Sequence, residues 1–132
     1  MLMPTVERYM TIQPLTIESR TSIGSAHLIM REHAIRHLPV VDDGKLVGIV
    51  SDRDLRLLES VGGLRSARVR DAMSEPVFSV ATDTPIDEIA RTMSDHKYGS
   101  AVVVTNSGVV KGIFTMVDAC RALAAVLERA VG

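Results

Sequence analysis

The sequence predicts a small α/β (α+β) fold made of two copies of one β-α-β-β-α unit. Two observations support this prediction: the chain repeats itself, and strand-like and helical patterns follow the same order in each copy. Hydrophobic residues make up 46% of the 132 residues, whereas aromatic residues make up only 3%. We therefore expect an aliphatic core, and a chain of this length can bury one without disulfides or metals.

The internal repeat appears when the sequence is shifted by 63 residues, or by 64 after Asn106-Ser107. Identical residues then align along the whole unit, including Val6 with Val69, Met10 with Met73, Gly48 with Gly112 and Asp54 with Asp118. Such regular self-similarity indicates duplication of one structural unit. We predict a first repeat at 1–59, a connection at 60–68 that contains Gly62-Gly63, and a second repeat at 69–132. Neither repeat would bury its sheet well alone, so we expect one packed body.

The first strand and first helix of each repeat follow from short-range patterns. An apolar run at 15–17, matched by 77–80, predicts the strand. The helix is predicted by side chains at i, i+3, i+4 and i+7, which share one face. They are Ile23, Ala26, His27 and Met30 in the first repeat, and Ile86, Ile89, Ala90 and Met93 in the second. Thr84, followed by Pro85 and Asp87, predicts an N-cap at the start of the second of these helices.

Two β-rich runs come next in each repeat and predict antiparallel hairpins. Asp43-Gly44 separates the first pair of runs, and Asn106-Ser107-Gly108 separates the second. Both are turn signals of hairpins. A second helix then closes each repeat. The last helix carries the apolar residues Ala119, Cys120, Leu123, Val126 and Leu127, and we expect Cys120 to be buried.

Composition argues against several classes of function. A net charge of −1 is unlike that of a protein that binds nucleic acid, and the lack of Trp disfavours a stacking platform. No apolar run is long enough to cross a membrane, and a single Cys with no signal segment favours a cytoplasmic protein. His33 and His37 are not expected to share an element, so we predict no metal site.

The strings GIVSDRD (Gly48 to Asp54) and GIFTMVD (Gly112 to Asp118) occupy equivalent places in the two repeats. A Gly permits close approach of another backbone, and apolar strand residues offer a flat wall to a base. A hydroxyl at the strand end can bond a phosphate or ribose oxygen, and an Asp three residues later can accept ribose hydroxyls. The helix N-terminus adds donors for an anion. The same residues could serve only as helix caps, and that alternative remains open here.

These two strings and the repeat resemble the CBS domain family, from Val6 to about Leu123. The resemblance implies two CBS repeats packed sheet to sheet as a pseudo-twofold module with two clefts, each shared between repeats. One implied cleft uses Ile49, Ser51, Arg53 and Asp54 with Val80, Ser100 and Ala101. The other uses Ile113, Thr115 and Asp118 with Thr16, Ile17, Arg36, His37, Leu38 and Pro39. Arg36 and His37 could equally be ordinary surface residues.

Gly99-Ser100 stands where the first repeat has Arg36-His37, and Val117 stands where it has Arg53, so cations for phosphates come only from the first repeat. The resemblance implies a regulatory module that senses AMP, ADP, ATP, NAD or a related adenosine ligand and requires no cofactor. It also implies a homodimer and an unidentified effector protein. The alternative is a ligand-free dimerising scaffold. An enzyme is not predicted, because no phosphate loop with Lys, acid pair or metal cluster is present.

Overall fold

The computed structural model describes residues 2–61 and 66–132, which divide into two compact units. The central unit is Leu15–Val77, and the terminal unit joins Met1–Pro14 to Phe78–Gly132. The predicted α/β class is confirmed, because each unit combines helices with a sheet. The Gly62-Gly63 part of the predicted connection lies outside the described residues. Among the residues described, no helix is both long and apolar enough to span a bilayer.

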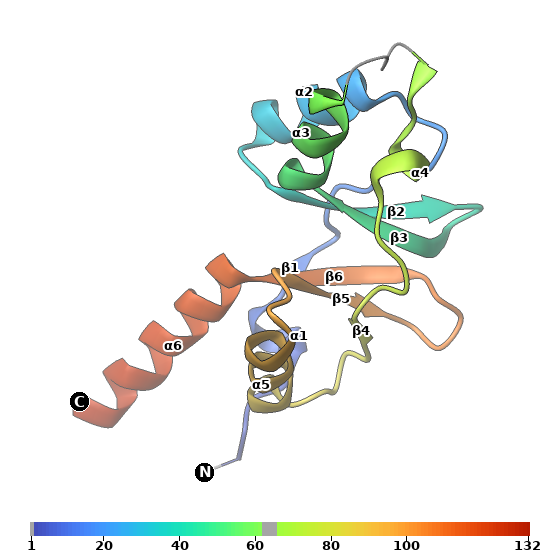
Figure 1. The fold of residues 1–132 in the computed structure, drawn as a ribbon. Coiled ribbons are helices and arrows are strands. Elements are labelled where there is room, and N and C mark those ends of the chain that lie inside the picture. The colour runs from blue at the N-terminus through green and yellow to red at the C-terminus, as the bar shows by residue number, and fades with distance from the viewer. Residues whose placement is uncertain (1, 62–65) are drawn as a thin grey trace. The chain divides into compact units, whose positions relative to one another are not determined.

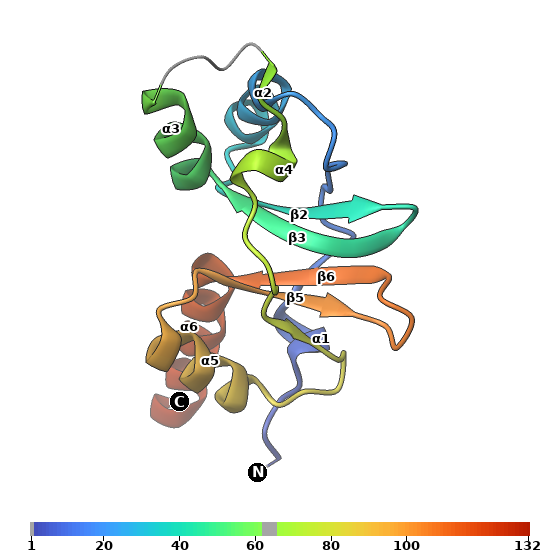
Figure 2. The same ribbon diagram turned by 45° about the vertical axis from the view of Figure 1, so that its right-hand side comes forward.

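The central unit is built around one antiparallel hairpin. Its elements are α2 (Ile23–His33), β2 (His37–Asp42), β3 (Lys45–Ser51), α3 (Asp52–Ser60) and α4 (Val69–Ala72). Asp43 and Gly44 have φ angles of 52° and 77°, as a two-residue turn between twisted strands requires, so this turn was predicted correctly. All three helices lie on one face of the hairpin (Figures 1 and 2).

The terminal unit has a four-stranded sheet. Its elements are α1 (Val6–Tyr9), β1 (Thr11–Ile12), β4 (Ser79–Val80), α5 (Ile86–His96), β5 (Ser100–Val104), β6 (Val110–Thr115) and α6 (Met116–Val131). The strand order is β1-β6-β5-β4, with only the β4–β5 pair parallel. Gly108, at φ 88°, closes the predicted turn between β5 and β6. The helices α1, α5 and α6 lie on one face of this sheet (Figure 1).

Both units share one sheet topology, although the outer strands of the central unit shrink to single bridges. Ile17 pairs in parallel with Val40, as β4 pairs with β5, and Ser74 pairs with Ile49, as β1 pairs with β6. The first strand predicted at 15–17 is therefore one bridged residue, and that at 77–80 is only β4. Each has a neighbour on one side alone, so little of its backbone is held in a ladder.

The segment that opens each repeat packs in the unit formed mainly by the other repeat. Val6 lies in the core of the terminal unit, and its N–H donates to the carbonyl of Thr84 at 2.8 Å. The equivalent Val69 lies in the core of the central unit and donates to Thr21, also at 2.8 Å. The short helices α1 and α4 were not predicted, although the Val6–Val69 identity marked their positions. The compact units therefore divide the chain near Pro14 and Val77, whereas the sequence repeats run 1–59 and 69–132.

The repeated glycines make room for this exchanged segment. A Cβ atom added to Gly48 would lie 2.6 Å from Sδ of Met73 and 3.3 Å from the carbonyl oxygen of Ser74. A Cβ atom on Gly112 would collide with Met10 and lie 3.0 Å from the carbonyl oxygen of Thr11. The same contact between a glycine and a methionine therefore occurs in both units, which is why Gly and Met recur at these positions of the repeat.

Three local predictions were wrong. Pro85, not Thr84, is the N-cap of α5, because Oγ1 of Thr84 bonds backward to the carbonyl of Ala81 at 2.8 Å. Ala90 is exposed, because α5 buries a narrower face through Ile86, Ile89 and Met93. Cys120 is also exposed, because α6 turns Asp118 and Ala122 toward the unit instead.

Candidate ligand-binding site

The central unit gathers four of the predicted ligand residues where β3 ends and α3 begins. Ser51 is the N-cap of α3: its Oγ accepts from the N–H of Asp54 at 3.1 Å, and Oδ2 of Asp54 accepts from the N–H of Ser51 at 2.9 Å. His37 is the register partner of Ser51 across the hairpin, and the carbonyl of Arg36 accepts from the N–H of Asp52 at 2.8 Å. The backbone of Arg36 and His37 therefore lies beside the N-terminus of α3.

The His37 imidazole of this cluster has a shifted pKa. Partial burial lowers the pKa of His37, the Asp54 carboxylate opposes that shift, and the Arg36 guanidinium reinforces it. A bound anion would favour the protonated imidazole, so this cluster can respond to a phosphate.

The terminal unit repeats the same arrangement with different neighbours. Thr115 is the N-cap of α6, and Oδ2 of Asp118 accepts from its N–H at 2.9 Å and from its Oγ1 at 3.2 Å. Ser100 is the register partner of Thr115, as His37 is of Ser51. In both units the predicted hydroxyl and carboxylate form a capping box, so each pair stabilises its helix in addition to any ligand role.

The two carboxylates differ in how many bonds they already make. Asp118 is 2% exposed, and its Oδ1 accepts from Oγ1 of Thr11 at 3.0 Å and from Nη1 of Arg121 at 3.3 Å. Within the described part of the chain, Asp54 accepts only the bond from Ser51, and it is partly exposed. Sequence reasoning missed Thr11 and Arg121. Thr11 could have been found from the repeat, because its equivalent Ser74 also carries a hydroxyl group.

The remaining predicted residues fall into two groups. Thr16 and Arg53 are exposed and free to meet a ligand. The others are buried or half-buried, and Ile17, Leu38 and Ala101 belong to the hydrophobic cores, so these three would contact a ligand mainly through backbone groups. The whole second group comprises Ile17, Leu38, Pro39 and Ile49 in the central unit, and Val80, Ala101 and Ile113 in the terminal unit.

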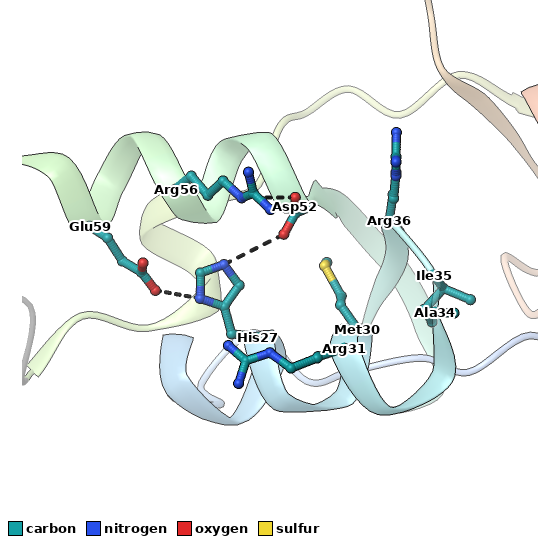
Figure 3. Close-up of a pocket in the computed structure, with 9 residues that line it drawn as sticks. All are labelled: His27, Met30, Arg31, Ala34, Ile35, Arg36, Asp52, Arg56 and Glu59. Atoms are coloured by element: carbon teal, nitrogen blue, oxygen red, sulfur yellow. Dashed lines mark ion pairs between the residues drawn. The ribbon is translucent and has the colours of Figure 1, made fainter.

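Two surface pockets among the described residues lie outside the capping boxes. One, of about 510 Å³, lies between α2 and α3 and is lined by His27, Arg56 and Glu59 among others (Figure 3). Arg36 is the predicted ligand residue that reaches it. The other, of about 780 Å³, lies beside β1 and includes Glu7, Asp83 and Lys111. The residues that the structure describes contain no group of three or more potential metal ligands.

Two β-α-β-β-α repeats in tandem, each with a capping box at its last helix, are the architecture of a CBS domain pair. The CBS domain family model matches residues 6–59 and 69–125, so this chain belongs to the CBS domain family.

Solved structures cover almost the whole chain. A candidate acetoin utilization protein (AcuB) from Vibrio cholerae is 36% identical, with a TM-score of 0.86 over 96% of this chain and 95% of that one. The CBS domain pair of MJ0100, solved with 5′-methylthioadenosine and S-adenosyl-L-methionine, is 30% identical, with a TM-score of 0.85 over 94% and 98%. CBSX2 of Arabidopsis thaliana, solved with AMP, is 30% identical, with a TM-score of 0.81 over 92% and 97%.

Curated relatives include larger enzymes. An L-aspartate semialdehyde sulfurtransferase of Methanocaldococcus jannaschii is 34% identical over 82% of this chain, but the match spans only 21% of that enzyme. The inosine-5′-monophosphate dehydrogenase of Korarchaeum cryptofilum is 32% identical over 85% of this chain and 23% of the enzyme. The chain thus spans about a fifth of the length of these relatives.

Proposed function

We propose that this chain is a regulatory module that binds an adenosine-containing ligand, such as AMP, ADP, ATP or NAD, and passes a conformational change to a partner protein. The observation that carries the proposal is the repeated capping box, Ser51 with Asp54 and Thr115 with Asp118, each at the end of an apolar strand. Each box offers a hydroxyl and a carboxylate beside a helix N-terminus, which suits a ribose and its phosphate.

The ligands of the related CBS pairs support the adenosine part of the proposal. MJ0100 was solved with two adenosine derivatives and CBSX2 with AMP, and adenosine is the part that these ligands share. In this chain, Arg36, His37 and Arg53 supply the cations for phosphate groups. We propose the residues assigned to the two clefts from the sequence as the ligand-contacting set.

The chain has few aromatic side chains, so adenine would be held by backbone groups and apolar walls rather than by stacking. A conformational signal requires that the ligand bind one arrangement of the module more tightly than another. We further propose that two copies of the chain form a dimer, through which a change at one site can reach a partner.

A thermal-shift screen tests this function. A ligand that binds only the native state raises stability by RT ln(1 + [L]/Kd), about 2.7 kcal/mol at 100 times Kd. Adenosine nucleotides should raise the melting temperature, whereas cytidine and uridine nucleotides with the same phosphates should raise it less. Equal shifts for all bases would indicate recognition of phosphate alone. No shift with any nucleotide would favour the ligand-free scaffold.

A further inference from the structure

The terminal unit contains the cavity of about 780 Å³ beside β1, and none of the predicted ligand residues, all of which the structure describes, lines it. Ser100 pairs with Thr115 at one end of β5 and β6, where the capping box lies, whereas Val104 pairs with Val110 at the other end. Val104 lines the cavity, together with residues of α1, of β1 and of the segment that follows β4. The cavity is therefore separate from the half-site of Thr115 and Asp118.

The central unit holds a carboxylate at the place that is equivalent in the repeat. Oδ1 of Asp42 accepts from the N–H of Ser19 at 3.1 Å, and Oδ2 accepts from Oγ of Ser19 at 2.6 Å. These hydrogen bonds lower the pKa of Asp42, and the positive charges of Arg20 and Arg70 lower it further. An anionic side chain of the chain itself therefore occupies this place between two cations.

The shift of 63 residues reverses every charge of this group. The equivalent pairs are Arg70 with Glu7, Arg20 with Asp83, Asp42 with Thr105, and Ser19 with Thr82. The backbone follows the same correspondence, because the N–H of Glu7 donates to the carbonyl of Thr82 at 3.3 Å, as that of Arg70 donates to Ser19 at 2.9 Å. Both cations thus become acids in the terminal unit, and the anion becomes an uncharged threonine.

The two acids of the terminal unit have no cation of the chain between them. Glu7 and Asp83 line the cavity and are exposed, and in the described part of the chain no ion pair includes either of them or Lys111. Thr105 serves its own turn, since its Oγ1 accepts from the N–H of Val109 at 3.1 Å. The cavity therefore carries negative charge that the terminal unit does not neutralise, whereas the central unit neutralises the charge of Asp42.

We propose that this cavity binds a small organic ammonium compound, a primary amine with an aliphatic part, at the place that Asp42 fills in the central unit. An ammonium group has three N–H donors and no acceptor, so it can donate to the carboxylates of Glu7 and Asp83 together. Such charge-assisted hydrogen bonds are stronger than those between neutral groups. The ligand would reproduce, with opposite charges, the arrangement that the central unit makes from its own side chains.

The remaining lining of the cavity suits an aliphatic ligand. Met10, Ile12 and Val104 contribute apolar surface, and Ile12 is 67% exposed. Covering this surface with methylene groups would remove it from water, whereas a metal ion would leave it exposed. Lys111 lines the same cavity and can pair with a carboxylate on the ligand. An α-amino acid and a simple amine therefore share the chemistry that the cavity recognises.

Titration of ¹⁵N-labelled protein, followed by amide chemical shifts at constant ionic strength, gives the first test. The probes are L-norleucine, pentylamine, which is norleucine without its carboxylate, and hexanoate, which is norleucine without its amine. Pentylamine should shift the amides of Glu7, Thr82 and Thr105, and hexanoate should not. Tighter binding of norleucine than of pentylamine would support an amino acid, and the reverse order would support a simple amine. Equal effects of hexanoate and pentylamine, or no shift with either amine, would overturn the inference.

Variants of the acids give the second test. Glu7→Gln and Asp83→Asn should each weaken pentylamine binding by about 2- to 5-fold, the range of an exposed ion pair. Glu88→Gln is the matched control, because Glu88 is an exposed acid of α5 outside the cavity lining, and its affinity should be unchanged.

Thr105→Lys tests the place of the ligand, because it adds a tethered ammonium group where Asp42 lies in the central unit. This variant should lose pentylamine binding, and its melting curve would verify that it remains folded. Undiminished binding by folded Thr105→Lys would contradict the placement. Undiminished binding by both Glu7→Gln and Asp83→Asn would overturn the inference even where Thr105→Lys fails to fold.

Discussion

Thr11 donates a hydrogen bond from its Oγ1 to Oδ1 of Asp118 over 3.0 Å, joining residues 107 positions apart in the sequence. Asp118 is the carboxylate that we propose as a ribose acceptor, so a ribose hydroxyl must compete with Thr11 and with Arg121 for the same oxygen. The equivalent carboxylate, Asp54, accepts a single bond within the described residues. Before any ligand binds, Asp118 therefore already accepts more hydrogen bonds than Asp54 does.

Replacing Thr11 by Val should raise the affinity for AMP by about 2- to 12-fold, because it removes a competing donor whose net contribution is about 0.5 to 1.5 kcal/mol. Val keeps the branched shape that suits β1. Isothermal titration calorimetry provides the measurement. Ser74→Ala is the control, since no bond from Ser74 to Asp54 is found in the described part of the chain. Weaker binding by Thr11→Val would mean that Thr11 contacts the ligand itself.

The stability of the fold should fall as the solution is acidified through the ordinary His pKa. Burial lowers the pKa of His37 below the ordinary histidine value of 6.5, so the unfolded chain binds that proton more tightly than the folded chain. This contribution is present above pH 6.5 and is lost as the pH falls through the lowered pKa. His37→Gln should flatten the dependence in urea melts recorded between pH 5 and 8. An unchanged slope would exclude His37 as its source.

Gly112→Ala should destabilise the chain by about 1 to 3 kcal/mol, because the new methyl group would collide with Met10. Combining it with Met10→Ala should cost less than the sum of the two single changes, which a double-mutant cycle by denaturant unfolding would show. Gly24→Ala is the control: Gly24 lies in α2 with nothing within 4 Å of an added Cβ, so this change should stabilise by about 0.5 kcal/mol. Additive costs for Gly112 and Met10 would contradict the contact.

The sequence was sufficient to predict the duplication and the order of the long elements, and it offered helix capping as the alternative role of the Ser/Thr-Asp pairs. The turn at Asp43-Gly44 and the pairing of Ser51 with Asp54 depend on residues only a few positions apart. The exchange of Val6 and Val69 between units could not be predicted, because the same local pattern would fit either core. The Thr11–Asp118 bond and the exposure of Cys120 likewise depend on how distant segments pack.

The central claim is that the Ser/Thr-Asp boxes bind an adenosine ligand, and calorimetric titration with AMP of the unmodified chain, Asp118→Ala and Asp54→Ala tests it most directly. The family resemblance implies that Arg36 and His37 serve the site of Thr115 and Asp118, and on that proposal we expect Asp118→Ala to lose about 10- to 150-fold in affinity, equivalent to roughly 1.5 to 3 kcal/mol. Asp54→Ala should change the AMP affinity of the Thr115–Asp118 site little. Circular dichroism would verify that both variants remain folded. Unaltered AMP binding by Asp118→Ala, together with its loss in Asp54→Ala, would contradict the assignment, and no binding by the unmodified chain would contradict the function.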